Sequence, residues 1–410
     1  MERVFKNDRC TLNSQLEMAE KKKYSILIVA YEASLLQLLS FIKSLKKENP
    51  SVVIHLLTNG KMDSVTNEIK EYVSRVFYIQ EYHGKYREKK ILSYLNKCLF
   101  YFQFVKLSFR NYDIVNIHFA RPVLLRAMRW IRKMTKNIVI TPWGSDVLRL
   151  DDANAINRMR VIYSYASRVT CDPNCQLGLQ VIEKFKYDSQ NMPSLRWGLE
   201  YVDYIEKAKP NKTEEEAKDR FGLTGRYVIT CGYSTAPSHR HEAIVDAVNS
   251  IKEQLPENLT LLFPFTYGWG TREYVQSVKD KCVSLGINAV FVEEYLNLED
   301  LYTMRMATDM FVHVQTTDAG ASCVMQYILC HKKIIHGSWM KYMDLEQYKP
   351  LFYYPVDSMD NLAEVILNAY HSCGIDIPDG VIKAIMDKGW NKQMKKWDCL
   401  FASLANKETN

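Results

Sequence analysis

The sequence predicts a protein of the α/β class that is built from two parallel-sheet domains. At 410 residues the chain is longer than one ordinary domain. Strand-like apolar runs alternate with helix-like runs over almost its whole length, which is typical of βαβ units whose sheet is covered by helices on both faces. The alternation pauses near residues 196–204 and then restarts, so we expect a domain boundary there.

The first half contains six strand-like runs, and helical patterns such as 35–47 and 122–134 fill the gaps between them. The strand-like runs cover residues 24–30, 52–57, 75–79, 114–118, 137–141 and 168–171. They predict a first Rossmann-like domain over residues 24–204. Residues 1–23 are polar and contain no long apolar stretch, so we expect a flexible N-terminal tail.

The second half restarts the pattern after residues 205–215, a charged segment with Pro210 that is typical of a linker. Its strand-like runs cover residues 227–231, 259–263, 289–292, 310–314 and 333–336, and its helical patterns cover 241–254, 271–285, 298–306 and 323–330. They predict a second Rossmann-like domain over residues 216–378. Residues 380–404 form one long helical pattern that contains Trp390 and Trp397.

Composition and motifs exclude several classes of protein. A hydrophobic fraction of 47% and a charged fraction of 25% are those of a soluble globular protein. The first strand is followed by AYEASLLQL rather than by a G-x-G-x-x-G loop, which argues against a dinucleotide dehydrogenase, and no Walker lysine loop is present. The ten cysteines are scattered without zinc spacing. We interpret them as reduced thiols, and with no visible secretory signal we expect a cytoplasmic protein.

Basic and aromatic residues are interleaved in one part of the first domain. Residues 84–136 contain thirteen Lys or Arg against two acids, within a formal net charge of +7 for the chain. Residues 86–110 therefore predict either an interfacial helix on an anionic membrane or an amphipathic helix whose apolar side faces the core. We expect at most a peripheral association, on the inner face of the plasma membrane. No nucleic-acid reader motif accompanies the charge, so no nucleic-acid partner is expected.

The segment 308–337 carries the clearest sign of a ligand site. It predicts a buried strand, a loop of small residues, a helix and a second strand. The loop leaves the backbone amides at the helix start open, namely those of Ala319, Gly320, Ala321 and Ser322, and such amides suit a phosphate or sugar hydroxyls. Asp318 precedes the helix, and Gln326 follows eight residues later. The alternative is an ordinary strand–loop–helix unit of a parallel sheet.

Four further motifs complete the pattern: VNIHFARP (115–122), TPWGSDVLR (141–149), CGYSTAPSHRHEAIVDAV (231–248) and LFPFTYGWG (262–270). Together with segment 308–337 they resemble the GT-B glycosyltransferases of family 4, and also the bacterial transferases of 4-acetamido-4,6-dideoxygalactose (Fuc4NAc). The resemblance is strongest over residues 227–337. It implies two Rossmann-like domains that face each other across an interdomain cleft, with the acceptor domain first and the nucleotide-sugar domain second. It also implies that the terminal segment 379–410 crosses back to the first domain.

The resemblance assigns roles to residues of the second domain. Asp318 and Gln326 stand where the family has a Glu-x7-Glu pair, so Asp318 is expected at the donor sugar and Gln326 at the ribose. Arg240 takes the place of a diphosphate-binding residue, although a solvated side chain is the alternative. The family's other arginine is replaced by Tyr233.

Loops beside these residues are expected to complete the nucleotide site. Ser234 and Thr235 offer hydroxyls and amides that could compensate for the replaced arginine. Tyr267 and Gly268 are expected near the phosphates. Tyr295 is expected beside the base, with a loop anchor as the alternative.

In the first domain the resemblance places His118 at the donor sugar, where a satisfied structural histidine is the alternative. Asp146 is expected to bind hydroxyl groups of the sugar or acceptor, or else to cap the following helix. If the reaction inverts the anomeric centre, either residue could act as the general base. If it retains that centre, as in family 4, the leaving phosphate can take the acceptor proton.

These observations predict a nucleotide-sugar-dependent glycosyltransferase of bacterial surface polysaccharide synthesis, acting on a glycan or lipid-linked acceptor. No Asp-x-Asp element is present, so we expect no metal ion, and no cofactor besides the donor substrate. The alternatives are a nucleotide-sugar epimerase of the same fold and a catalytically weak binding partner of another transferase.

Overall fold

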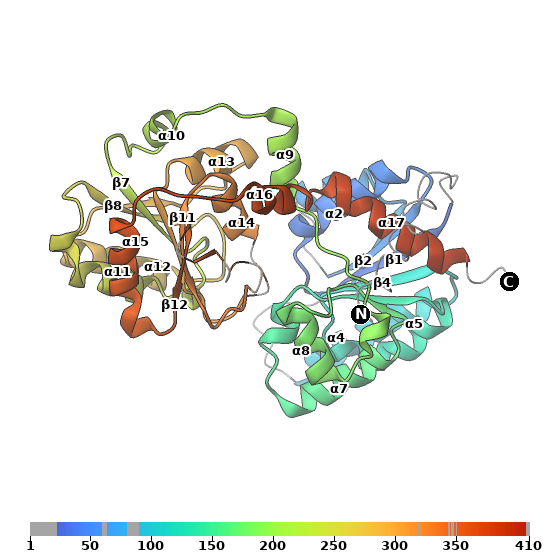
Figure 1. The fold of residues 1–410 in the computed structure, drawn as a ribbon. Coiled ribbons are helices and arrows are strands. Elements are labelled where there is room, and N and C mark those ends of the chain that lie inside the picture. Colours follow the sequence, from blue (N-terminus) through green and yellow to red (C-terminus); the bar gives the residue numbers. More distant parts are fainter. Residues whose placement is uncertain are drawn as a thin grey trace, which may run out of the picture. The chain divides into compact units, whose positions relative to one another are not determined.

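The computed structural model describes residues 23–59, 64–79, 90–318, 320, 322–342, 345, 348–349 and 351–406. The chain divides into two compact units (Figure 1). The first unit comprises residues 1–198 together with 390–410, and the second comprises residues 199–389. Apart from Lys23, the tail expected over residues 1–23 lies outside the described residues.

The first unit is an α/β layer structure around a six-stranded parallel sheet of order β3-β2-β1-β4-β5-β6. Its strands are β1 (Ser25–Ala30), β2 (Val53–Thr58), β3 (Arg75–Tyr78), β4 (Ile114–His118), β5 (Ile138–Thr141) and β6 (Arg168–Val169). Its helices are α2 (Leu35–Glu48), α3 (Ser64–Lys70), α4 (Lys90–Leu107), η1 (Pro122–Ala127), α5 (Met128–Met134), α6 (Ser145–Leu148), α7 (Ala153–Ser164), α8 (Gln176–Phe185), η2 (Ser189–Asn191) and α17 (Trp390–Asn406).

Two apolar cores cover the two faces of this sheet. One core joins alternate strand residues to α4, α5, α7 and α8, and the other joins the remaining strand residues to α2 and α17. The strands are apolar on both sides because the sheet is buried on both sides, as in parallel sheets generally. Helix α17 packs on α2, so the last helix of the chain completes the core of the first unit.

The second unit repeats the same sheet order, β12-β11-β10-β7-β8-β9. Its strands are β7 (Tyr227–Cys231), β8 (Leu259–Pro264), β9 (Ala289–Val292), β10 (Met310–His313), β11 (Lys333–Gly337) and β12 (Tyr353–Val356). Its helices are α9 (Glu200–Ala208), α10 (Glu214–Arg220), η3 (Pro237–His239), α11 (His241–Ser250), η4 (Lys252–Gln254), α12 (Arg272–Ser284), α13 (Leu298–Met306), α14 (Ser322–Leu329), η6 (Met359–Asn361), α15 (Leu362–His371) and α16 (Asp379–Met386).

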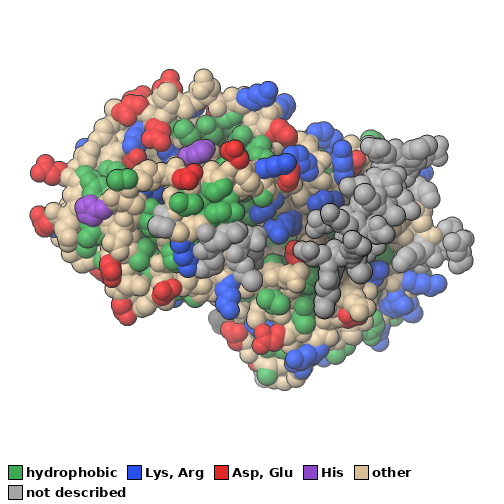
Figure 2. All heavy atoms as spheres, in the orientation of Figure 1, with side chains coloured by type: hydrophobic (Ala, Val, Ile, Leu, Met, Phe, Trp, Pro, Cys, Tyr) green, Lys and Arg blue, Asp and Glu red, His purple; other side chains and the backbone are tan. Residues whose placement is uncertain are grey.

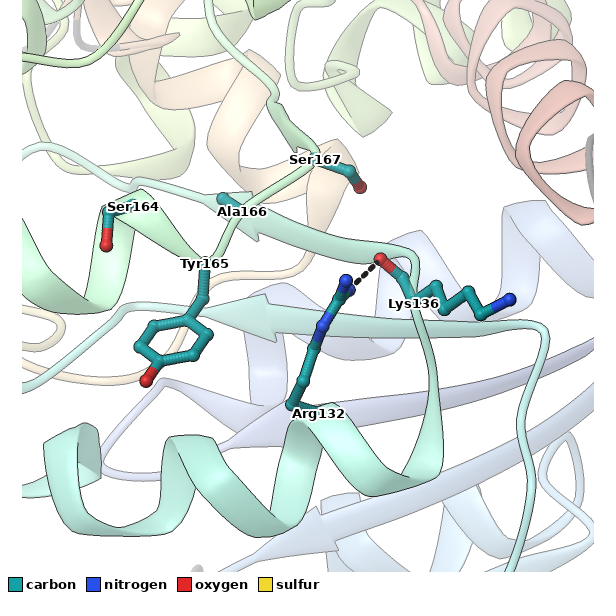
Figure 3. Close-up of a pocket in the computed structure, with 6 residues that line it drawn as sticks. All are labelled: Arg132, Lys136, Ser164, Tyr165, Ala166 and Ser167. Atoms are coloured by element: carbon teal, nitrogen blue, oxygen red, sulfur yellow. Dashed lines mark hydrogen bonds between the residues drawn. The ribbon is translucent and has the colours of Figure 1, made fainter.

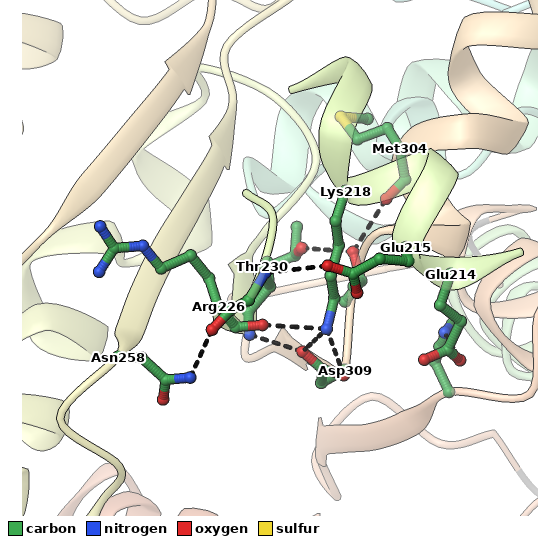
Figure 4. A network of polar contacts seen from close by, with 12 residues as sticks. Glu214, Glu215, Lys218, Arg226, Thr230, Asn258, Met304 and Asp309 are labelled. Atoms are coloured by element: carbon green, nitrogen blue, oxygen red, sulfur yellow. Dashed lines mark hydrogen bonds and ion pairs between the residues drawn. The ribbon is translucent and has the colours of Figure 1, made fainter. Parts of the chain in front are cut away.

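Helices also cover both faces of the second sheet (Figure 1). Helices α11, α12 and α15 pack on one face, and α10, α13, α14 and α16 pack on the other. On that second face a partly buried ion pair ties α10 to the start of β10: Lys218 Nζ lies 2.9 Å from Asp309 Oδ2 (Figure 4). Asp309 also accepts the backbone N–H of Val228 at 2.7 Å, so α10, β7 and β10 are held together by one carboxylate.

Three details of the sequence-based prediction need correction. The sixth strand of the second sheet, β12, was not predicted. The segment 205–215 is helical at both ends, because α9 runs to Ala208 and α10 starts at Glu214. The single long helix expected over residues 380–404 is interrupted between α16 and α17, where Lys388 O accepts the backbone N–H of Leu199 and Gly389 lies against Asp203.

Candidate functional site

The strand order of the second unit defines where a ligand can bind. In open parallel sheets, ligands bind outside the carboxyl ends of the strands at the point where the strand order reverses. That point lies between β7 and β10, which are neighbours in the sheet. The loops that follow these two strands are residues 232–240 and 314–321, and they contain most of the predicted nucleotide-binding residues.

Arg240 is a partly exposed cation at this edge. It has a positive φ of 60° and is the N-cap residue of α11, so its backbone turns the chain from η3 into the helix. Its guanidinium lies 5.0 Å from the ring centre of Trp339, and Trp339 Nε1 donates to Gln315 O at 2.7 Å. No acidic side chain in the described part of the chain forms an ion pair with Arg240. Its charge is therefore available to an anionic ligand.

Thr235, which precedes Arg240 in the loop after β7, forms one hydrogen-bonded turn with Tyr267 and Gly268. The Tyr267 carbonyl accepts the Thr235 N–H at 2.8 Å and the Thr235 hydroxyl at 3.2 Å. Gly268 has a φ of 129°, and a Cβ there would lie 2.4 Å from Thr235 Oγ1, so only glycine fits. The Tyr267 side chain is 57% exposed, whereas Ser234 is buried and its hydroxyl is paired with His239 Nε2 at 3.0 Å.

Asp318 is held by two side chains that the sequence did not point out. His313 Nε2 lies 2.8 Å from Asp318 Oδ2, and the Tyr342 hydroxyl donates to the same oxygen. His313 ends β10 and is wholly buried. Asp318 is therefore a positioned carboxylate, oriented by its own unit.

The start of α14 is only partly described. Ser322 begins the helix and is exposed, and Gly320 is exposed with a φ of 98°. Ala319 and Ala321 lie outside the described residues, so the predicted amide cradle remains a prediction at those two positions.

Gln326 differs from the expectation of a residue open to a ribose. It is buried, and its Oε1 accepts from Nε of Arg305 at 3.2 Å. Arg305 was not singled out from the sequence, although a signal was present. Leu298, Leu301, Tyr302 and Arg305 follow helical spacing, so the arginine occupies the apolar stripe of α13.

Tyr295 lies beyond the carboxyl end of β9 and its side chain is 68% exposed. This position is compatible with a residue that a nucleobase covers. Its predicted role stays a prediction.

In the first unit, His118 is the last residue of β4 and is wholly buried. Trp143 Nε1 lies 3.3 Å from His118 Nδ1, and because an indole N–H can only donate, Nδ1 is the acceptor. The proton of the neutral ring then sits on Nε2, which is buried and has no hydrogen-bond partner among the described residues. Burial lowers the pKa of His118 to about 3, so the ring is neutral at pH 7.

Asp146 lies in α6 and is buried rather than open. Its Oδ1 accepts the backbone N–H groups of Trp143 and Gly144 at 3.0 and 2.9 Å, which closes the tight turn at Gly144. Its Oδ2 is buried and accepts no hydrogen bond from the part of the chain that the structure describes. Burial raises the pKa of Asp146 to about 6, against the lowering effect of the two backbone hydrogen bonds. The neighbouring Ser145 is exposed.

A shallow hollow of about 330 Å³ lies elsewhere in the first unit (Figure 3). Its walls include Arg132 and Lys136, which precede β5, and Ser167, which precedes β6. Arg132 Nη1 donates to Lys136 O at 2.7 Å. The hollow is therefore at the amino ends of the strands, opposite the edge that carries His118.

Two negative observations concern the described residues only. No three or more His, Cys, Asp or Glu side chains among them are arranged to hold a metal ion. None of their helices has the length and apolar character needed to cross a bilayer.

Lys and Arg side chains are spread over the face in Figure 2 with Asp and Glu among them, rather than gathered in one large patch.

No model of a known protein family and no curated protein matches this chain. Solved structures do match it. A glycosyltransferase from Rickettsia africae aligns with a TM-score of 0.69 at 13% identity, over 94% of this chain and 99% of the other. Anabaena HepE in complex with UDP and glucose aligns with a TM-score of 0.60 at 12% identity, over 94% of this chain and 98% of the other. The lipopolysaccharide outer core galactosyltransferase WaaB in its apo form aligns with a TM-score of 0.62 at 12% identity, over 93% of this chain and 99% of the other. The chain thus has the GT-B fold, with two parallel six-stranded sheets.

Proposed function

We propose that the protein transfers a sugar from a nucleoside-diphosphate sugar to a glycan or lipid-linked acceptor. The observation that carries this proposal is Arg240, a cation without an acidic partner among the described residues, placed where the strand order of the second sheet reverses. The GT-B fold supports the same reaction class. One of the structures that shares the fold contains UDP and glucose.

The chemistry required of the second unit is stabilisation of a leaving diphosphate. Negative charge builds on its oxygens as the glycosidic bond to the donor breaks, and fixed positive groups lower the energy of that state. Arg240 supplies one full charge, at the end of the loop between β7 and α11 that also carries Thr235. We propose that the charge of Arg240 stabilises the leaving diphosphate without a metal ion.

His118 is proposed to orient the donor sugar. Its Nε2–H is a buried donor that no described residue accepts, and a sugar hydroxyl or ring oxygen would satisfy it. A neutral histidine held in one tautomer by Trp143 positions a substrate without taking its proton. We therefore propose a retaining reaction, in which the leaving phosphate takes the acceptor proton, and assign Asp146 to the turn rather than to a base.

The acceptor is proposed to be a bacterial surface glycan or its lipid-linked precursor. The name of WaaB, a lipopolysaccharide outer core galactosyltransferase, supports this class of acceptor. The donor sugar suggested by the sequence motifs, Fuc4NAc, belongs to the same proposal. A nucleotide-sugar-binding protein without turnover is the second candidate, favoured by the engagement of Gln326 with Arg305.

The proposal is tested by measuring nucleotide binding to wild type and to Arg240→Ala. Thermal shift with UDP-, GDP- and dTDP-sugars first selects the donor base. Loss of one charged hydrogen bond costs about 1.5–3 kcal/mol, so Arg240→Ala should weaken binding roughly ten- to hundredfold in titration calorimetry. Arg226→Ala is the matched control, because this exposed arginine precedes β7 at the opposite edge of the sheet. Equal affinities in wild type and Arg240→Ala would remove the assignment. Stabilisation by a donor without hydrolysis or transfer would favour the second candidate.

We also propose that α4 docks on an anionic membrane. Residues 86–89 lie outside the described residues, but Leu95, Phe102 and Phe109 follow at seven-residue spacing and are 44%, 61% and 87% exposed. Residues seven apart share one helix face, so Leu95 and Phe102 lie on the same face of α4. Phe109 follows in the turn after the helix ends at Leu107. Helix α4 contacts α5, whose exposed neighbourhood is entirely basic and comprises Arg126, Arg129, Arg132, Lys133 and Lys136. Each basic side chain at such a surface contributes about 1 kcal/mol.

Vesicle flotation checks this surface. Wild type should float with vesicles rich in anionic lipid, and the double variant Phe102→Ala, Phe109→Ala should float several-fold less. Leu179→Ala removes a half-exposed apolar side chain from α8 and should float like wild type. No flotation of the wild type, or equal flotation of all three proteins, would contradict the membrane assignment.

A further inference from the structure

Arg305 is a buried cation without a carboxylate partner in the described part of the second unit. It projects from α13 and is 4% exposed. Its Nε donates to Gln326 Oε1 at 3.2 Å, and its Nη1 donates to the Tyr327 hydroxyl at 2.7 Å. Its guanidinium carbon also lies 4.4 Å from the Tyr327 ring centre. All three contacts are with neutral groups.

A neutral environment compensates a buried charge only in part. A guanidinium has five N–H donors, and the two hydrogen bonds use two of them. The ring contact offsets only part of the cost of burying an isolated ion. Nearby Asp309 is already paired with Lys218. Arg305 therefore has unused donors and an unbalanced charge inside the fold.

The contact with Arg305 also decides what Gln326 can offer a ligand. Because Oε1 accepts from Arg305, the amide is oriented with its NH2 group away from the guanidinium. Gln326 Nε2 has no hydrogen-bond partner among the described residues. A glutamate at this position would pair with Arg305 and present acceptors to hydroxyl groups. Glutamine beside arginine presents donors only.

Gln326 carries its donors on α14, the helix that starts at the ligand edge of the sheet. Gln326 and Tyr327 are in the second turn of α14, which starts after the loop that carries Asp318. Burial raises the pKa of the Cys323 thiol in the first turn, while Arg305 lowers it and Asp318 raises it, so both charges act on this turn. The positive end of the α14 dipole adds to the field of Arg305.

We infer that Arg305 and Gln326 form a subsite for an anionic oxygen group of the donor. This inference rests on the proposed function and refines it, because it replaces a ribose-binding role of Gln326 by an anion-binding one. The anionic group could come from the nucleotide diphosphate or from a carboxylate on the transferred sugar. Both offer the charged acceptor oxygens that a guanidinium binds best.

The test measures the affinities of UDP, GDP, dTDP, UDP-glucose and UDP-glucuronate for wild type, Arg305→Met and Gln326→Glu by titration calorimetry. Arg305→Met keeps the volume and removes the charge. Gln326→Glu keeps the arginine but gives it an internal counter-ion, so this variant should be at least as heat-stable as wild type. Both variants should weaken anion binding at least tenfold. Arg220→Met is the matched control, because this exposed arginine of α10 already pairs with Asp300.

The ligands separate the two sources of the anion. An equal loss for the nucleoside diphosphates and their sugars assigns the subsite to phosphate. A loss confined to UDP-glucuronate relative to UDP-glucose assigns it to a sugar carboxylate. Unchanged affinities in Gln326→Glu, with a folded protein, overturn the inference. If Arg240→Ala weakens binding while both new variants bind like wild type, only this inference fails. If wild type binds none of the five ligands, the proposed function fails with it.

Discussion

His118 shows how burial sets the chemistry of a single residue. The ring is enclosed at the end of β4, with Trp143 and Trp197 against it. Burial lowers its pKa to about 3, well below the 6.5 of an unfolded histidine. A residue that stays neutral at every pH near 7 orients a substrate better than it moves a proton.

The same pKa predicts a pH dependence of stability. Between pH 6.5 and about 3 the unfolded chain binds a proton at His118 and the folded chain does not, so stability falls as the pH falls through this window. At pH 4.5 the loss amounts to about 2–3 kcal/mol. Asp146, whose pKa is raised to about 6, acts in the opposite direction, because its stability contribution falls as pH rises between 3.8 and 6.

Urea unfolding of wild type and His118→Asn at pH 7 and pH 4.5 separates the two effects. Asp146 is common to both proteins, so their difference isolates His118. The wild type should lose more free energy of unfolding on acidification than the variant does. Equal losses would show that His118 can be protonated in the folded protein.

Sequence reasoning could place some site residues and not others, for physical reasons. Strand ends follow from apolar runs, so the pattern placed His118 at the end of a strand and Asp318 in the loop after another. Arg240 was assigned from the family resemblance. The contacts of Asp318 with Tyr342 and of Gln326 with Arg305 join residues 24 and 21 positions apart. Such pairings depend on how helices pack on the sheet, which a linear pattern does not contain.

At the scale of elements, the turn around Gly268 connects the loop after β8 to the loop after β7, where the strand order of the second sheet reverses. A Cβ at Gly268 would meet both Thr235 Oγ1 at 2.4 Å and Thr235 N at 2.8 Å, and its φ of 129° is strained for any other residue. Gly268→Ala should therefore lower the free energy of unfolding by about 1–3 kcal/mol and weaken nucleotide binding.

Gly374→Ala is the control, since its φ of 70° is also positive but no atom lies within 4 Å of the added Cβ. Thermal unfolding with and without nucleotide checks both. Equal effects of the two substitutions would mean that backbone strain alone, and not the contact with Thr235, causes the loss of stability.

Element boundaries were predicted well where the apolar pattern was uniform. β4, β7, β9 and α13 were predicted with the bounds that the structure has. β12 was missed because Pro355 interrupts its pattern, and proline is tolerated there since the strand lies at the edge of the sheet. The break between α16 and α17 was missed because its cause is a contact with residues near 200, far away in sequence.

For the whole molecule, the last helix belongs to the first unit although the second unit precedes it in the chain. Trp397 anchors it: the side chain is 1% exposed, its Nε1 donates to Arg196 O at 3.0 Å, and its ring lies 5.1 Å from that of Phe41. Trp397→Ala should cost the first unit about 3–5 kcal/mol. Lys395→Ala, on the exposed side of α17, should cost little.

Amide hydrogen exchange measures the effect of Trp397→Ala separately in each unit. In Trp397→Ala the strands β1, β2 and β4 should lose protection, while β7 and β10 keep theirs. Equal loss in both sheets would contradict the division of the chain into two separately stabilised units.

The central claim is that the second unit binds a nucleoside diphosphate at the carboxyl edge of its sheet, with Arg240 on the phosphates. A crystal structure with the nucleotide sugar that most stabilises the protein tests it most directly. We predict the diphosphate within hydrogen-bond distance of Arg240 and beside the Thr235–Gly268 turn. A nucleotide bound at the amino edge of either sheet, or bound without contact to Arg240, would contradict the account.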